Sequence, residues 1–163
     1  TFQTSSPSMD ISKASNFERF IFDLLGRDSV RLSNYWKKID QGGSFRLSEE
    51  EFDRISFFGF ISSSSQHTNR IKLISNYFEQ FGIMIDTHTA DGLKAALDHI
   101  DKDTPMIVLE TALPIKFEQS ILEATGKKPE RPEALKDIEL LNQKLEILDN
   151  DVDLIRSFIR ENT

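Results

Sequence analysis

The chain has 163 residues, of which 38% are hydrophobic and 29% charged, a composition typical of one folded globular domain rather than of a disordered or fibrous chain. Its formal net charge of -7 argues against a nucleic-acid partner, because binding to phosphate backbones needs clustered Lys and Arg. The absence of cysteine excludes disulfides, thiolate metal ligands and a cysteine nucleophile.

The sequence also lacks membrane and export signals. No apolar run approaches the ~20 residues that a membrane span needs, and residues 1–7 have neither the basic start nor the apolar core of a signal peptide. We therefore expect no membrane partner and a cytoplasmic location. Because the chain begins with Thr1 rather than with methionine, we also expect a further part of the protein upstream.

Helical periodicity marks the first third of the chain. Residues 15–18 have the pattern of a capping box, and the apolar spacing after them predicts an amphipathic helix that ends at Gly26. A second helix is predicted over about 28–40. Ser48 and Glu51 repeat the capping pattern and predict a short third helix.

The middle of the chain alternates apolar runs with helical spacing. An apolar, aromatic segment at 57–61 is expected to be buried and to lead into a polar serine loop at 62–65. Helical spacing follows over 68–81 and again over 90–100. Between these two helices, the apolar residues 83–85 predict a short buried strand.

The last third begins with a continuous apolar run at 106–109, which is typical of a parallel strand covered on both faces. A helix is predicted after it, from about Phe117. Residues 127–132 form a polar linker interrupted by prolines. Two further helices are expected, over about 134–141 and 151–159.

This alternation predicts an α/β fold: a partial open sheet with flanking helices. Two or three strands are too few for a complete open sheet, so the missing strands should lie in another segment. We expect residues 1–126 to form one domain, with residues 127–163 as a linker and carboxy-terminal helices packing on the same domain.

Candidate chemistry lies where each strand ends, because ligands of open α/β sheets bind beyond the carboxyl ends of the strands. These loops are 86–89 and 110–116, and they offer hydroxyls, an imidazole, a carboxylate and an ammonium group. A purely structural interpretation stays open, in which Asp86 and Thr89 only cap the next helix.

Other catalytic patterns are absent from the sequence. The three histidines have no short metal-binding spacing, and no glycine-rich phosphate loop occurs. Lys116 follows the second predicted strand, but a solvated lysine is far commoner than one bonded to a cofactor. We therefore expect no metal site and no catalytic residue in this chain.

Three stretches resemble threonine synthase of the bacterial and fungal type. They are Ser-Pro-Ser-Met-Asp-Ile at 6–11 with Ser-Asn-Phe-Glu-Arg-Phe at 15–20, Gly-Ile-Met-Ile-Asp-Thr-His-Thr-Ala at 82–90, and Val-Leu-Glu-Thr-Ala-Leu-Pro-Ile-Lys-Phe at 108–117. Their order and separation also agree with that family, so the resemblance is specific.

The resemblance implies a fold-type-II pyridoxal-phosphate enzyme that converts O-phosphohomoserine and water into threonine and phosphate. Residues 1–126 would then be the carboxy-terminal portion of its catalytic domain, and the partner would be the missing amino-terminal half. The family's cofactor-binding lysine and its glycine-rich phosphate loop would lie in that half. The fragment alone is therefore expected to be inactive.

By position in the family, Thr111 matches a threonine whose hydroxyl faces the pyridine nitrogen of the cofactor. Such a neutral donor orients the ring and tunes it more gently than a carboxylate would. Asp86 and Thr89 match the other cofactor-side turn, and Asn16 is a further cofactor-side candidate from the first stretch.

Two positions depart from the family pattern. Leu113 replaces the usual histidine, which puts any role of that histidine in doubt. Thr87 replaces the usual proline and is expected to loosen a turn by freeing φ.

Two alternatives of another class stay open. A receiver-like signalling domain is suggested by the Thr-Ala-Leu-Pro turn after the strand at 106–109, although the largely helical start of the chain argues against it. A noncatalytic scaffold that keeps an old enzyme sequence is the other, because fold and function can part company.

Overall fold

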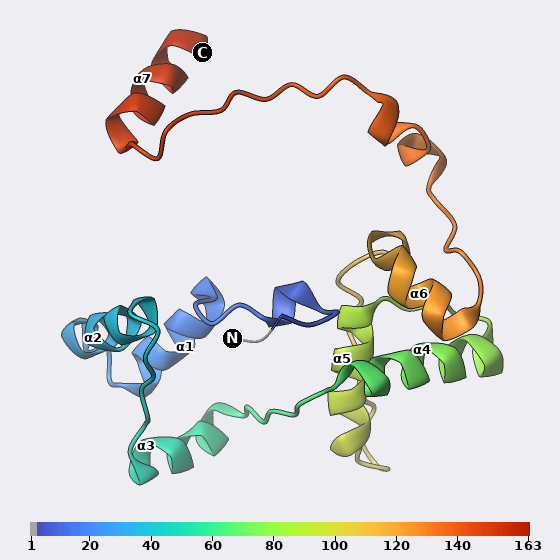
Figure 1. Cartoon of the computed structure of the whole chain (residues 1–163). Helices are drawn as coiled ribbons and strands as arrows, with labels where there is room; N and C mark the ends of the chain where they lie inside the picture. Colours follow the sequence, from blue (N-terminus) through green and yellow to red (C-terminus); the bar gives the residue numbers. More distant parts are fainter. Residues whose placement is uncertain (1–2) are drawn as a thin grey trace. The chain divides into compact units, whose positions relative to one another are not determined.

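A computed structural model describes residues 3–163, and within this range it contains helices and no β-strand (Figure 1). The chain divides into two compact units, one up to Glu130 and the other from Arg131 onward, and each is described by itself. The α-helices are α1 Ser15–Leu24, α2 Ser29–Asp40, α3 Glu49–Arg54, α4 His67–Phe81, α5 Thr87–Asp98, α6 Glu118–Thr125 and α7 Val152–Asn162. Short 3-10 helices are η1 Pro7–Met9, η2 Ile55–Phe58, η3 Pro114–Phe117, η4 Glu133–Leu135 and η5 Ile138–Leu140.

The predicted α/β fold with a partial open sheet is wrong for residues 3–163, because neither 83–85 nor 106–109 forms a strand. A strand needs a neighbour that pairs with its N–H and C=O groups, and the described chain offers none. Exposure contradicts the expected core strand too, since Ile107 and Leu109 are 81% and 75% exposed. Of these two segments, only Ile85 is fully part of a core.

The first core joins α1 to α2. Ile21, Leu24 and Leu25 of the first helix pack with Leu32 and Trp36 of the second, as the apolar spacing predicts. The predicted capping box at 15–18 is wrong, however, because the N-cap is Ala14 and no side chain caps the helix. Apolar burial, not capping, therefore accounts for α1.

A confirmed capping box starts α3. Glu51 N–H donates to Ser48 Oγ at 3.2 Å, and Ser48 N–H donates to Glu51 Oε2 at 2.9 Å. Arg31 of α2 binds the same carboxylate with two N–H groups, which lowers the pKa of Glu51 below its ordinary value. This ion pair ties α2 to α3.

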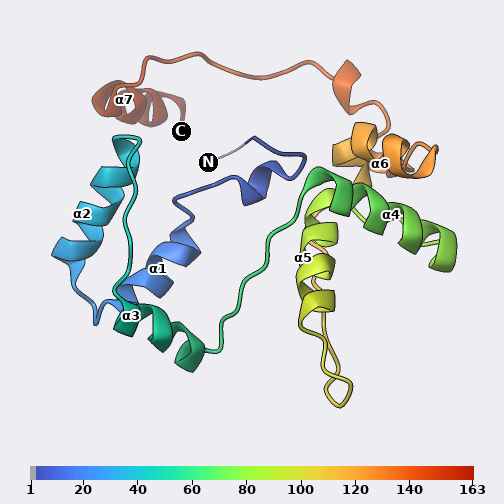
Figure 2. The same ribbon diagram turned by 60° about the horizontal axis from the view of Figure 1, so that its bottom comes forward.

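The second core lies among α4, α5 and α6, whose predicted positions are confirmed (Figure 2). The buried residues of this core are Ile74, Ile85, Ala90, Leu93 and Ile121. α4 ends at Gly82, whose φ of 68° is a left-handed conformation that costs glycine little.

The aromatic segment at 57–61 is exposed, which contradicts the predicted burial. Phe58 and Phe60 contact Phe20 of α1 with ring centroids 5.5 and 4.7 Å apart. These rings stay partly open to solvent because no further apolar layer covers them within the described residues. Together with Asn16, residues of this segment line a cavity of about 1070 Å³.

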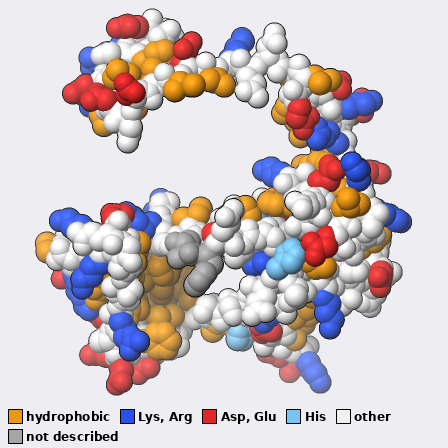
Figure 3. Space-filling model, in the orientation of Figure 1, with side chains coloured by type: hydrophobic (Ala, Val, Ile, Leu, Met, Phe, Trp, Pro, Cys, Tyr) orange, Lys and Arg blue, Asp and Glu red, His pale blue; other side chains and the backbone are white. Residues whose placement is uncertain are grey.

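In the unit from Arg131 onward, the helix predicted over 134–141 is wrong, and the two short helices η4 and η5 stand in its place. Short helices need a packing surface, and no residue of η4 or η5 is buried. The last helix is confirmed as α7, whose N-cap Asp151 accepts from the N–H groups of Asp153 and Leu154 at 2.9 Å. Its apolar side chains are largely open to solvent (Figure 3).

Across residues 3–163, no helix has both the length and the apolar content that crossing a bilayer would require.

Candidate functional site

The three motif stretches meet at the amino-terminal end of α5 (Figure 1). From the first stretch, Ser6 Oγ donates to the Thr87 carbonyl at 3.3 Å, and Ser8 N–H donates to His88 Nε2 at 3.0 Å. From the third stretch, the ring of Phe117 lies against the ring of His88, with centroids 4.7 Å apart. Segments that are about 80 and 30 residues from α5 in sequence therefore share one structural junction.

The sequence folds this way locally because Asp86 caps α5. Its fully buried carboxylate accepts from His88 N–H at 2.8 Å, from His88 Nδ1 at 3.2 Å and from the hydroxyl of Thr89. The capping role that the sequence left open for Asp86 and Thr89 is therefore present in the structure. Direct contact of either residue with a cofactor stays a prediction.

Sequence reasoning assigned no particular role to His88: its imidazole was counted among the polar groups of the 86–89 loop, and the spacing of the histidines was weighed only for metal binding. Its side chain is buried, and both ring nitrogens have partners. A backbone N–H can only donate, so Nε2 accepts from Ser8 and the proton lies on Nδ1, which donates to Asp86. The signal available in the sequence was its place two residues after a capping aspartate.

The other two predicted cofactor residues differ in position. Thr111 is exposed, and its hydroxyl has no hydrogen-bond partner within residues 3–163. Asn16 is also exposed, and its Oδ1 accepts from the N–H of Phe17 at 2.9 Å. It shares its cavity with His99, which is at the opposite end of α5 from Asp86. The structure therefore does not bring Asn16 to the junction.

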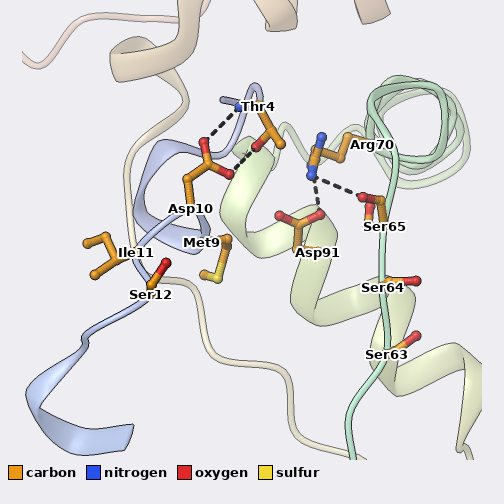
Figure 4. Close-up of a pocket in the computed structure, with 10 residues that line it drawn as sticks. All are labelled: Thr4, Met9, Asp10, Ile11, Ser12, Ser63, Ser64, Ser65, Arg70 and Asp91. Carbon is orange, nitrogen blue, oxygen red and sulfur yellow. Dashed lines mark hydrogen bonds and ion pairs between the residues drawn. The ribbon is translucent and has the colours of Figure 1, made fainter. Parts of the chain in front are cut away.

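A buried arginine organises the surroundings of the junction (Figure 4). Arg70 of α4 donates from Nε to Asp91 Oδ1 at 2.7 Å, from Nη1 to Ser5 Oγ at 3.1 Å, and from Nη2 to the Ser65 carbonyl at 3.2 Å. One side chain thus holds the amino-terminal segment, the serine loop and α5 together. The amino-terminal segment, the serine loop, α4 and α5 line a cavity of about 530 Å³.

The amino-terminal segment is closed on itself before it reaches α5. Thr4 donates from its N–H to Asp10 Oδ2 at 2.7 Å and from its hydroxyl to Asp10 Oδ1 at 2.9 Å (Figure 4). The 3-10 helix η1 lies inside this loop and is closed by a hydrogen bond from Met9 N–H to the Ser6 carbonyl at 2.8 Å. Asp10 therefore shapes the segment that presents Ser6 and Ser8 to α5.

Replacing Thr87 by proline is expected to raise the free energy of unfolding by about 0.4–1 kcal/mol. Thr87 is the first residue of α5, where proline is favoured because that N–H has no acceptor within the helix. Asp86, with ψ of 172°, already has the extended backbone that proline requires of the residue before it. The buried Thr87 hydroxyl also has no partner among the described residues.

Urea unfolding of the variant measures this change. Ala90→Pro is the matched control, because Ala90 N–H donates to the Asp86 carbonyl at 2.9 Å, and its loss should cost about 3 kcal/mol. If Thr87→Pro instead loses stability, the threonine hydroxyl has a partner in the rest of the protein.

Metal chemistry has no donor set at the junction. In the described part of the chain, no group of three His, Cys, Asp or Glu side chains is arranged to hold a metal ion. Hydroxyls dominate the junction instead, and they suit hydrogen bonding to a polar ring or an anion.

Comparison with solved structures relates the chain to pyridoxal-phosphate enzymes. It matches part of a pyridoxal-phosphate-bound structure from Brucella melitensis with a TM-score of 0.76 and 31% identity, covering 98% of this chain and 34% of the other. That structure is a threonine synthase, as is a yeast structure matched with a TM-score of 0.72 and 27% identity over 98% of this chain and 36% of that one.

Sequence comparison agrees. The chain is 55% identical to threonine synthase of Methylobacillus glycogenes and 44% identical to that of Corynebacterium glutamicum, covering 99% and 98% of this chain and 34% of each relative. Residues 89–159 match the family described as "Threonine synthase, C-terminal". The chain therefore corresponds to the carboxy-terminal region of threonine synthase, as its three motif stretches indicate, and it spans about one third of the length of these relatives.

Proposed function

We propose that this chain forms the carboxy-terminal part of an enzyme that converts O-phosphohomoserine and water into threonine and phosphate with pyridoxal phosphate. The observation that carries the proposal is the junction at α5, where the three family stretches meet through Ser8, His88 and Phe117. The three stretches that resemble the family are distant in sequence but adjacent in space, as residues that serve one site would be. The receiver alternative loses its basis, because a receiver needs a sheet and the described residues have no strand.

Pyridoxal phosphate supplies an electron sink for the substrate when it is bound. Within this chain, the residue that fits it best is Thr111, whose exposed hydroxyl has no partner in the described structure and is free to donate. We propose that this hydroxyl faces the pyridine nitrogen and fixes the orientation of the ring.

Asp86 and Thr89 fit a supporting place. Both oxygens of the Asp86 carboxylate already accept hydrogen bonds, and the Thr89 hydroxyl donates to one of them. A contact with the cofactor would therefore use the lone pairs of Thr89 or compete with the cap of α5. We propose that these residues fix the cofactor-side turn, and we keep Asn16 as a candidate whose contact would come from the separate aromatic cavity.

The remaining machinery is proposed to lie outside this chain. The sequence has no glycine-rich phosphate loop, and Lys116 lies exposed in η3. A lysine that bonds to a cofactor is typically desolvated or placed beside an activating group, and an exposed lysine is not. We therefore propose that the catalytic lysine belongs to the rest of the protein and that the chain alone is inactive. As a separate proposal, we place the whole protein in the cytoplasm.

The test is threonine formation by the full-length protein of which this chain is a part. With pyridoxal phosphate and O-phosphohomoserine, it should release threonine and phosphate in equal amounts, and Lys116→Ala should keep that activity. The chain alone should form neither product. Absence of threonine formation by the full-length protein would favour the scaffold alternative, and loss of activity in Lys116→Ala would contradict the assignment of the lysine.

A further inference from the structure

His88 has contacts that no other side chain in the junction combines. Its Nε2 accepts from the N–H of Ser8, its Nδ1 donates to Asp86, and its ring lies against Phe117. The residue is 4% exposed, so these contacts lie in a buried place with little access to water. An uncharged imidazole provides an aromatic face together with a donor and an acceptor on two separate ring nitrogens.

The contact with Ser8 is selective for this tautomer. Asp86 accepts a hydrogen bond at Nδ1 and Ser8 donates one at Nε2, so the two neighbours specify opposite roles for the two nitrogens. Ser6 adds a second hydrogen bond beside it, from its hydroxyl to the Thr87 carbonyl. The amino-terminal segment is thus fixed against the first turn of α5.

The contact of His88 with Phe117 also fixes the segment that carries Thr111. Phe117 ends the 3-10 helix η3, in which Lys116 N–H donates to the Leu113 carbonyl at 3.1 Å. That bond makes η3 a closed turn, so fixing Phe117 also fixes Leu113. Thr111 lies two residues before Leu113 and has no hydrogen bond of its own in the described structure. Its position therefore depends on what holds η3.

We propose that His88 is a positioning residue that holds Thr111 in place for the cofactor by fixing η3 and the amino-terminal segment to α5. This inference rests on the proposed role of Thr111. His88 itself touches neither the cofactor nor the substrate in this account. It acts through Phe117 on one side and through Ser8 on the other.

Two variants of the full-length protein separate the contacts of His88. His88→Phe keeps a ring for Phe117 but removes both hydrogen bonds, whereas His88→Gln keeps an acceptor for Ser8 and removes the ring. Having two variants also keeps the test decisive if one fails to fold. The control is His67→Gln, because His67 Nδ1 contacts the same amino-terminal segment through Ser5 Oγ at 2.9 Å.

The first readout is amide hydrogen exchange, which reports local order without the cofactor. His88→Phe should speed exchange about tenfold in 3–10, where it loses the acceptor for Ser8. His88→Gln should speed exchange in 111–117 more than His88→Phe does, because it loses the ring contact with Phe117. Exchange in 111–117 that stays at the wild-type rate in both variants would overturn the proposal.

The second readout is the affinity for pyridoxal phosphate and the absorbance spectrum of the bound cofactor. His88→Gln should weaken affinity about fivefold and shift the absorbance maximum, while His67→Gln should change neither. Equal effects of His88→Gln and His67→Gln would overturn the proposal, because any anchor of the amino-terminal segment would then be enough to maintain cofactor binding.

Combining His88→Gln with Thr111→Val distinguishes failure of this inference from failure of the proposed function. If His88 acts through Thr111, the double variant should bind the cofactor no more than about twofold weaker than Thr111→Val alone. Independent, additive losses would overturn the inference. Wild-type affinity in the single Thr111→Val variant would instead contradict the proposed role of Thr111, while hydrogen exchange would still decide whether His88 orders η3.

Discussion

Replacing Arg70 with methionine is expected to lower the free energy of unfolding by about 3–5 kcal/mol. The Arg70 and Asp91 side chains are only 4% and 12% exposed, so removing the guanidinium leaves a carboxylate without its countercharge in a poorly hydrated place. Asp91 Oδ2 already has no hydrogen-bond partner in the described structure, which increases that penalty. The variant also loses the hydrogen bonds to Ser5 and to the Ser65 carbonyl.

Urea unfolding followed by circular dichroism of the full-length protein measures this loss. Arg156→Met is the control, because Arg156 also pairs with a carboxylate, that of Asp153, but the two side chains are 57% and 87% exposed, so we expect a loss of about 1 kcal/mol or less. Adding Asp91→Leu to Arg70→Met should restore part of the stability, since a buried pair can be replaced by apolar groups at little cost. Equal losses for the two arginines would contradict the view that burial sets the difference.

Replacing Thr111 with valine in the full-length protein is expected to weaken pyridoxal-phosphate binding about 5- to 150-fold, which corresponds to roughly 1–3 kcal/mol. Valine nearly matches threonine in shape but removes the donor that we propose for the pyridine nitrogen. Stability should hardly change, because Thr111 is exposed and has no hydrogen bond within residues 3–163. It does not cap a helix either, since the N-cap of η3 is Leu113.

Cofactor titration and thermal unfolding of the same protein measure both parts of this prediction. Thr111→Ser is the control, because it keeps the hydroxyl and should keep most of the affinity. A lowered melting temperature with unchanged affinity in Thr111→Val would show that the threonine is structural and that the assignment is wrong.

Helices were predictable where one face of the local sequence is apolar. In α1 and α4, residues such as Ile21 and Ile74 recur at helical spacing and are buried in the structure. The ends of helices were less predictable, because several side chains can offer a cap. Ser48 and Glu51 form the expected capping box, whereas α1 begins after the N-cap Ala14 without one.

The strands were wrongly predicted for a physical reason. An apolar run such as 106–109 indicates that its side chains favour burial, but it does not show which part of the protein covers them. Within residues 3–163 no strand pairs with it, and Ile107 is exposed. The same reasoning applies to 57–61, where the aromatic rings lack a complete apolar layer around them.

The candidate site was predictable only in part. Asp86 and Thr89 could be found from their place at the start of a predicted helix, and their capping role is present in the structure. Thr111 was singled out by family resemblance and not by its local pattern. His88 was missed because its partners Ser8 and Phe117 are distant in sequence, so only the folded chain reveals the contacts.

The most direct test of the account is a crystal structure of the full-length protein with pyridoxal phosphate, in which one measures the distance from Thr111 Oγ1 to the pyridine nitrogen. We expect a hydrogen bond of about 2.6–3.2 Å, with His88 still between Ser8 and Phe117. A pyridine nitrogen that bonds to another residue, with the Thr111 hydroxyl turned away from the ring, would contradict it.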